Sequence, residues 1–225
     1  MSDSRREVFI ITFLSYTAVH CMRTSYSSIK PELTDACHTS IQAFGTKRCY
    51  LGIVDALILL FLGIGHFVHA IFPIKNPVRS LWTGLLSCSV IMAVFAISFN
   101  MKELQNYWIL AILMCFNGYM QSYTWPMLLM IVHSKFDPKK HNILLGFWAT
   151  NSNFGNIIGF GVSKLIFIIY PSDWTLIIGI SAVYTSIFGL LVYFRFKELP
   201  SAEDRKIDSD EKFDEKSQIT SSVCD

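Results

Sequence analysis

A polar stripe near the start of the chain contains residue types that bind anions. Its members are spaced four, three, four and three residues apart, so a helix would place them on one face; they are Tyr16, His20, Arg23, Ser27 and Lys30. The stripe includes no acid. A guanidinium has a planar fork that matches the oxygens of a phosphate group, and an ammonium adds a point charge. This pattern predicts a site for a phosphate or a similar anion.

The same stripe also has a purely structural interpretation. Lys30 would extend its ammonium to a membrane surface, and Arg23 would pair with Asp55 or with a carbonyl oxygen. An ionisable residue inside an apolar span costs about 2.5–3.5 kcal/mol on insertion scales, which makes function the first hypothesis. Both interpretations require a membrane-spanning helix around the stripe.

The composition indicates such a membrane setting. Hydrophobic residues make up 52% of the 225 residues and charged residues only 16%, whereas soluble domains carry about 25% charged residues. A bilayer-spanning helix needs about 20 mostly apolar residues. Six segments satisfy this length: 8–29, 52–74, 80–99, 107–133, 143–169 and 174–195. We therefore predict an all-α polytopic membrane protein with six transmembrane helices.

The charges outside these segments predict the orientation. The six-span domain covers 8–198, after a short N-terminus at 1–7 and before a polar tail at 199–225 for which we predict disorder. Lys and Arg in short loops collect on the cytoplasmic side. With the N-terminus inside, nine such residues lie on that side and three on the other. Both termini are therefore predicted to be cytoplasmic. The membrane is expected to be that of the endoplasmic reticulum, another endomembrane or the plasma membrane.

Two further segments carry polar faces that could meet the stripe. The fourth segment has a polar face at helical spacing, followed by a Trp-Pro pair: Asn117, Gln121 and Thr124, then Trp125 and Pro126. The fifth segment has Asn151 near its middle, and Gly155 and Gly159 are spaced for close helix contact. The amides either bond across helices or line a cavity. Three polar inner faces favour a water-accessible cavity within the bundle.

These motifs together resemble a known family. The stretch from Tyr16 to Lys30 is similar to the first-span pattern of Tyr, His, Arg and Lys in the sugar-phosphate exchangers of the major facilitator superfamily. Further motifs resemble the second, fourth and fifth spans of that family: Gly52-x-x-Asp55, Asn117-Gly118-x-x-Gln121-x-x-x-Trp125-Pro126, and Gly146-x-Trp148 followed by Gly155-Asn156-Ile157-x-Gly159. The resemblance covers about residues 8–198 and corresponds to the N-terminal six-span half.

The resemblance implies a function and a binding site. Family members exchange organophosphates, such as glucose 6-phosphate or glycerol 3-phosphate, for inorganic phosphate by alternating access, with one site shared between two six-helix halves. The first-span arginine binds the phosphate, which implies this role for Arg23. The substrate-binding residues expected here are Arg23, Lys30, His20, Tyr16, Asn117, Gln121, Trp125 and Asn151.

Three departures from the family pattern favour an alternative. The chain has six apolar segments where the family has twelve, and Asn151 occupies the place of a fifth-span histidine. The cytoplasmic loop 73–79 keeps the basic residues Lys75 and Arg79, which we assign a conformational role, but lacks the family's acid. The alternative is a non-transporting half that packs with or modulates a full-length transporter.

The remaining expectations concern partners and cofactors. We expect the lipid bilayer, a small anionic substrate, inorganic phosphate and a second six-span half as partners, and no nucleic acid. We expect no cofactor, no metal and no enzymatic activity, because no catalytic constellation is evident. Cys37 and Cys49 share one polar loop and could form a disulfide in an oxidising compartment.

Overall fold

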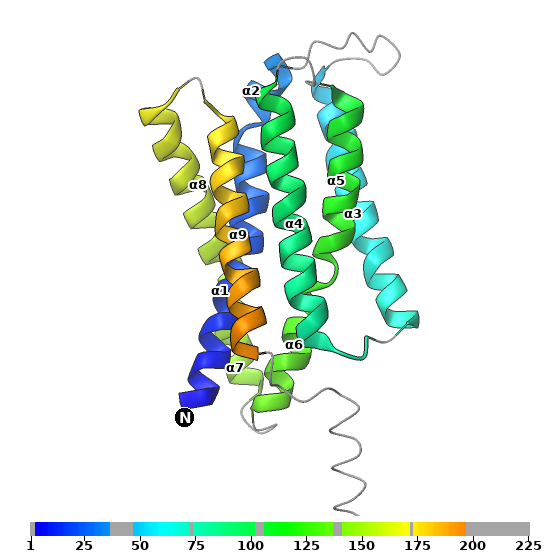
Figure 1. Cartoon of the computed structure of the whole chain (residues 1–225), viewed down its shortest axis with the longest axis vertical. Helices are drawn as coiled ribbons and strands as arrows, with labels where there is room; N and C mark the ends of the chain where they lie inside the picture. The colour runs from blue at the N-terminus through cyan, green and yellow to red at the C-terminus, as the bar shows by residue number, and fades with distance from the viewer. Residues whose placement is uncertain are drawn as a thin grey trace, which may run out of the picture.

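The protein is a bundle of long helices. The computed structural model describes residues 3–36, 47–72, 74–101, 106–136, 141–171 and 173–196, and within them it contains helices and no strands (Figure 1). The helices are α1 (Asp3–Ser28), α2 (Lys30–Ala36), α3 (Lys47–Ile71), α4 (Pro77–Asn100), α5 (Tyr107–Gln121), α6 (Thr124–Lys135), α7 (His141–Trp148), α8 (Asn151–Ile169) and α9 (Thr175–Phe196). The all-helical prediction is confirmed for this part of the chain.

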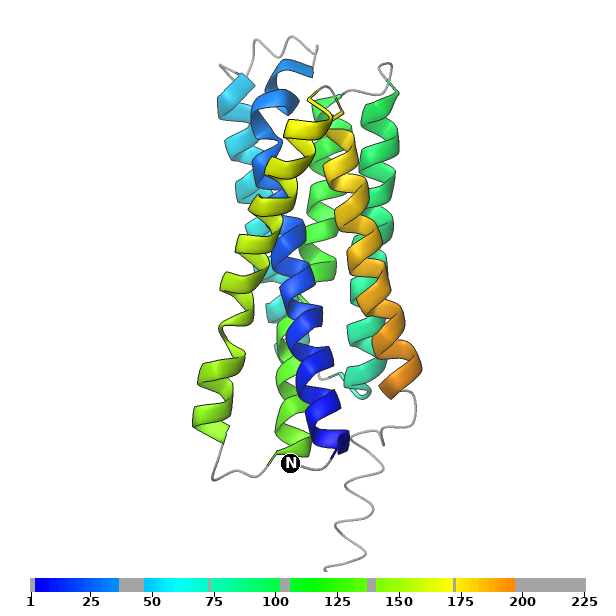
Figure 2. The same ribbon diagram turned by 90° about the vertical axis from the view of Figure 1, so that its left-hand side faces the viewer.

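Helix α1 runs through the middle of the bundle, although it is rich in hydroxyl side chains. It packs against α8, α9 and α6 (Figure 2). The hydroxyls of Thr12, Thr17 and Thr24 donate to the carbonyl oxygen four residues earlier, at 2.7, 2.9 and 2.9 Å. Such bonds satisfy a hydroxyl within its own helix. α1 can therefore be buried without leaving these groups unpaired.

The other helices build two sides around α1. α4 packs against α9, α5 and α6, and α3 packs against α5 at one edge of the bundle. Large apolar side chains cover the outer surface, and Phe67, Ile157 and Phe194 are 68%, 71% and 71% exposed. A soluble protein rarely exposes apolar surface on this scale, and this surface suits the hydrocarbon of a bilayer.

Within the described residues, four helical stretches are long and apolar enough to cross a membrane. The four are Tyr50–Ile71, Pro77–Asn100, Ile143–Ile169 and Thr175–Phe196. Two of the expected spans are not continuous helices. Segment 107–133 is interrupted at Ser122 and Tyr123, between α5 and α6. Pro126 explains this break, because proline cannot donate to the Ser122 carbonyl four residues earlier. Segment 143–169 is interrupted at Ala149 and Thr150, between α7 and α8.

The segment 30–51, which we expected to be a loop, contains further helix. α2 begins at Lys30, directly after the break at Ile29, and α3 begins at Lys47. Pro31 ends α1 here, since its ring would clash with the carbonyl four residues earlier in a continuous helix. Lys30 therefore belongs to a different helix from Arg23. Cys37 and the side chain of Cys49 lie outside the described residues, so their pairing stays a prediction.

The chain gathers several basic residues at one end of the bundle. The N-terminal end of α1, the α3–α4 connection and the C-terminal end of α9 lie together at the bottom of Figure 1. An ion pair joins two of these segments, from Arg195 Nε to Glu7 Oε1. Lys75 and Arg79 lie at the same end, in the connection and at the start of α4, and both are exposed.

Candidate anion site

Arg23 lies between two cavities in the middle of the bundle. The first, which we call the methionine cavity after Met22, Met92 and Met114, has a volume of about 210 Å³. The second, which we call the aromatic cavity after Tyr16 and Trp125, has a volume of about 440 Å³. Arg23 and Gln121 line both cavities. A ligand in either cavity can therefore reach the same guanidinium.

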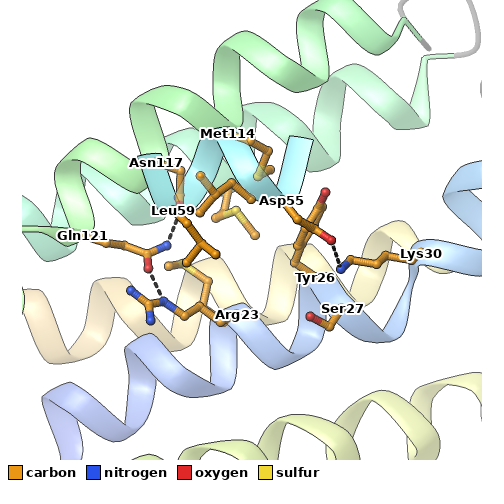
Figure 3. Close-up of a pocket in the computed structure, with 12 residues that line it drawn as sticks. Arg23, Tyr26, Ser27, Lys30, Asp55, Leu59, Met114, Asn117 and Gln121 are labelled. Carbon is orange, nitrogen blue, oxygen red and sulfur yellow. Dashed lines mark hydrogen bonds and ion pairs between the residues drawn. The ribbon is translucent and has the colours of Figure 1, made fainter. Parts of the chain in front are cut away.

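A chain of hydrogen bonds fixes the orientation of Arg23. Its Nε donates to Gln121 Oε1, and Gln121 Nε2 donates to Asn117 Oδ1 (Figure 3). Because a guanidinium only donates, Gln121 must present its oxygen to Arg23 and its nitrogen to Asn117. Asn117 is buried, and its Nδ2 has no partner among the described residues. This series of hydrogen bonds therefore ends in a donor, Asn117 Nδ2, at the wall of the methionine cavity.

The structural interpretation of the stripe gave Arg23 two alternative partners, Asp55 or a carbonyl oxygen, and the structure shows the second. Asp55 pairs with Lys30, with 2.6 Å between Nζ and Oδ2, and not with Arg23. Arg23 instead meets a carbonyl oxygen, that of the Gln121 side chain. Lys30 Nζ also lies 5.4 Å from the ring centroid of Tyr26, within the range of a cation–π contact. The five stripe residues do line cavities: Arg23, Ser27 and Lys30 the first, and Tyr16, His20 and Arg23 the second.

Aromatic rings in mutual contact form one wall of the aromatic cavity. The ring centroid of Tyr16 lies 4.7 Å from that of His20, 5.1 Å from Trp125 and 5.9 Å from Trp148. Trp148 is fully buried and donates from Nε1 to Thr12 Oγ1 at 3.2 Å. Rings held in this way keep one side of the cavity rigid near the guanidinium.

Asn151 lies apart from both cavities. It is fully buried, and its backbone oxygen accepts from Thr17 Oγ1 at 3.3 Å. Its two side-chain polar atoms have no partner among the described residues. Its place at the first residue of α8 gives no support to a substrate contact. Lys75 and Arg79 also line neither cavity.

Two glycines of α8 bring that helix against the stripe. A Cβ built on Gly155 would lie 2.5 Å from the Thr17 oxygen, and one on Gly159 would lie 2.8 Å from the Cys21 oxygen. The close contact predicted from their spacing is therefore confirmed. It lets Asn156 reach across, so that Thr24 Oγ1 donates to Asn156 Oδ1 at 2.8 Å. This amide therefore bonds across helices.

The apolar lining of the methionine cavity was not anticipated from the sequence. Met22, Met92 and Met114 come from three different helices and have no mutual spacing that could reveal them. The described residues contain no group of three His, Cys, Asp or Glu side chains placed to hold a metal ion.

Comparisons with known proteins place the chain in a family. Residues 8–223 match the Major Facilitator Superfamily. Glucose-6-phosphate exchanger SLC37A2 of Bos taurus is 28% identical over 220 residues, covering 89% of this chain and 44% of the relative. Sugar phosphate exchanger 3 of Homo sapiens is 22% identical, covering 93% and 46%. Putative glycerol-3-phosphate transporter 3 of Arabidopsis thaliana is 25% identical, covering 91% and 41%.

An apolar helical bundle that holds a cation between two internal cavities has the features of an integral membrane protein. This chain belongs to the Major Facilitator Superfamily. It spans about half the length of the curated relatives it matches. No solved structure matches the chain. The resemblance to sugar-phosphate exchangers that the motifs indicated is thereby confirmed.

Proposed function

We propose that this protein acts in the membrane exchange of a phosphorylated organic anion for inorganic phosphate, with Arg23 binding the phosphoryl group. The position of Arg23 between the two cavities carries this proposal. Among the described residues only Gln121 bonds the guanidinium, through Nε, which leaves both Nη groups for phosphate oxygens. A guanidinium binds phosphate through such paired donors. An ester of either glycerol or a sugar satisfies this chemistry.

The names of the relatives support the same class of substrate. Two are named as exchangers of sugar phosphates and one as a putative glycerol-3-phosphate transporter. We propose that residues 8–198 form six spans corresponding to half of such a transporter. Transport then requires a second six-span half, which is another copy, a separate chain, or a continuation of this chain in a longer product. In alternating access, Arg23 is exposed first through one cavity and then through the other.

The proposed orientation places both termini in the cytoplasm. The basic residues at the bottom of Figure 1, including Lys75 and Arg195, support this, because such residues collect on the cytoplasmic side. We assign the protein to the endoplasmic reticulum, another endomembrane or the plasma membrane.

Phosphate exchange in proteoliposomes tests the proposal. The purified chain is incorporated into vesicles loaded with phosphate, and uptake of labelled phosphate is measured for the parent and for Arg23→Ala. We expect exchange to fall about 10-fold to 100-fold, because hydrogen bonds to a charged group contribute about 1.5–3 kcal/mol. Lys164→Ala is the matched control, because it removes an exposed cation of α8 that lines neither cavity. Equal loss in both variants would contradict the assignment of Arg23.

A second candidate function is that of a non-transporting half that packs with or modulates a full-length transporter. One observation favours it: Arg23 already has a partner within the chain. This candidate predicts that a larger transporter co-purifies with the chain and that vesicles containing the chain alone are inactive. Exchange by the purified chain alone would exclude it.

A further inference from the structure

The methionine cavity is polar at both ends and apolar between them. Figure 3 shows Arg23 at one end and the pair of Lys30 and Asp55 at the other. The walls between the two ends are apolar: Met22, Ile58, Leu59, Met92 and Met114. Arg23 in α1 and Lys30 at the start of α2 are seven residues apart, and the apolar walls of the cavity lie between them. A ligand that contacts both ends must therefore be longer than a free phosphate.

Asp55 makes the second end unsuited to a phosphate group. It lies 2.6 Å from Lys30 Nζ and offsets the charge of that ammonium. The two side chains keep 30% and 39% of their surface, so both remain accessible from the cavity. An anion brought to this end would meet a carboxylate of the same sign, which repels it. The part of a ligand that lies here should therefore be uncharged.

A hydroxyl group satisfies both members of the pair. An ammonium only donates, a carboxylate only accepts, and a hydroxyl does both. One hydroxyl can therefore accept from Lys30 and donate to Asp55 while the ion pair stays intact. The exposed hydroxyl of Ser27 lines the same cavity. The Nδ2 of Asn117, which has no partner among the described residues, adds a further donor. Asn117 is only 2% exposed, and the hydrogen bond from Gln121 to its Oδ1 fixes the orientation of this amide.

We infer that Lys30 and Asp55 form a hydroxyl-recognition subsite, which makes the site selective for phosphate esters of polyols over inorganic phosphate and simple alkyl phosphates. This inference rests on the proposed function, because the phosphoryl group is taken to lie at Arg23. The hydroxyls of the ester then reach the ion pair, and its carbon skeleton lies against the methionine walls. Asn117 lies beside Gln121 at the Arg23 end, where an ester or phosphoryl oxygen can accept from its Nδ2.

Competition binding separates this role from simple electrostatics. Labelled phosphate is bound to the purified full chain, and displaced by methyl phosphate, glycerol 3-phosphate or glucose 6-phosphate. In Asp55→Asn we expect phosphate and methyl phosphate to bind about two-fold tighter or more, because a repelling charge is gone. We expect the two polyol phosphates to bind about ten-fold more weakly, because a hydrogen bond to a charged acceptor is lost. Opposite changes for the two ligand classes are the result that supports the subsite.

Two further variants control for charge and for folding. Glu7→Gln removes the acid of the other described ion pair and should leave all four affinities unchanged. The double variant Lys30→Gln/Asp55→Asn keeps two groups of similar size that can bond each other, so it reports selectivity if the single variant does not fold. It should also lose its preference for polyol phosphates.

The outcomes distinguish the subsite from the proposed function. If all ligands change by the same factor in Asp55→Asn and in the double variant, the pair is only a link between α2 and α3, and the subsite is refuted. If the parent binds phosphate but shows no preference for polyol esters, the subsite alone is again refuted. If the parent binds no phosphate at all, the proposed function fails and the inference fails with it.

Discussion

Replacing Gly155 with alanine tests how closely α8 must approach the anion site. A Cβ at this position would lie 2.5 Å from both the Thr17 oxygen and the His20 Cβ. Ordinary contact begins at 3.4 Å, and neither neighbour is the end of a flexible side chain. The two helices must therefore separate by about 1 Å or bend, and overpacking of this kind costs about 1–3 kcal/mol.

A matched glycine in the same helix isolates this steric effect. Gly161 has no atom within 4 Å of a built Cβ, so alanine fits there freely. Both substitutions raise helix propensity by the same amount, about 1 kcal/mol. The difference between the variants is then the steric cost alone. At about 2–4 °C per kcal/mol, Gly155→Ala should unfold about 3–10 °C below Gly161→Ala.

Thermal unfolding of the purified protein in one detergent measures the difference directly. Phosphate binding by the same two variants is a second readout, because a shift of α8 displaces His20 beside Arg23. The reasoning is refuted if Gly155→Ala unfolds at the same temperature as Gly161→Ala, or at a higher one. That result would show that α8 does not press against α1 at this position.

Two other substitutions have expected results that follow from single hydrogen bonds. Gln121→Glu keeps an acceptor for Arg23, but its carboxylate neutralises the charge of the guanidinium. Phosphate binding, measured by displacement, should weaken about ten-fold or more, while the unfolding temperature is retained. Unchanged binding would contradict the role of Arg23. Thr12→Val leaves the buried Trp148 N–H without its acceptor, which costs about 1–3 kcal/mol. The unfolding temperature should fall by about 3–10 °C, and no change would mean that the indole has found another acceptor.

Helical spacing was enough to predict which residues share a face. The interval from Tyr16 to Arg23 and the interval from Asn117 to Gln121 both follow the helix repeat, and these residues line the cavities as expected. The spacing of Gly155 and Gly159 likewise predicted a close helix contact, because a missing side chain has the same steric effect in any helix. Local geometry therefore accounts for much of the candidate site.

Pairing between helices was beyond such reasoning. That Arg23 meets Gln121 depends on how α1 rotates against α5, and that Lys30 meets Asp55 depends on how α2 lies against α3. A periodic pattern shows which residues share one face of a helix, but not which residues of a neighbouring helix that face contacts. For the same reason Asn151 was predicted to be a substrate contact, while the structure buries it beside Thr17. The break at Ser122 could have been anticipated from Pro126, because the proline cannot donate to the carbonyl of residue 122.

The hydroxyl-rich character of α1 has a consequence for how the protein enters the membrane during synthesis. α1 is not among the four helices that are long and apolar enough to cross a membrane by composition, yet it lies at the centre of the bundle. Insertion is driven by apolar side chains and opposed by charges such as Arg23. α1 should therefore remain at the insertion machinery until α6, and then α8 and α9, are available to shield it. Assembly and insertion of this helix would be one event, with helices made later completing the entry of α1.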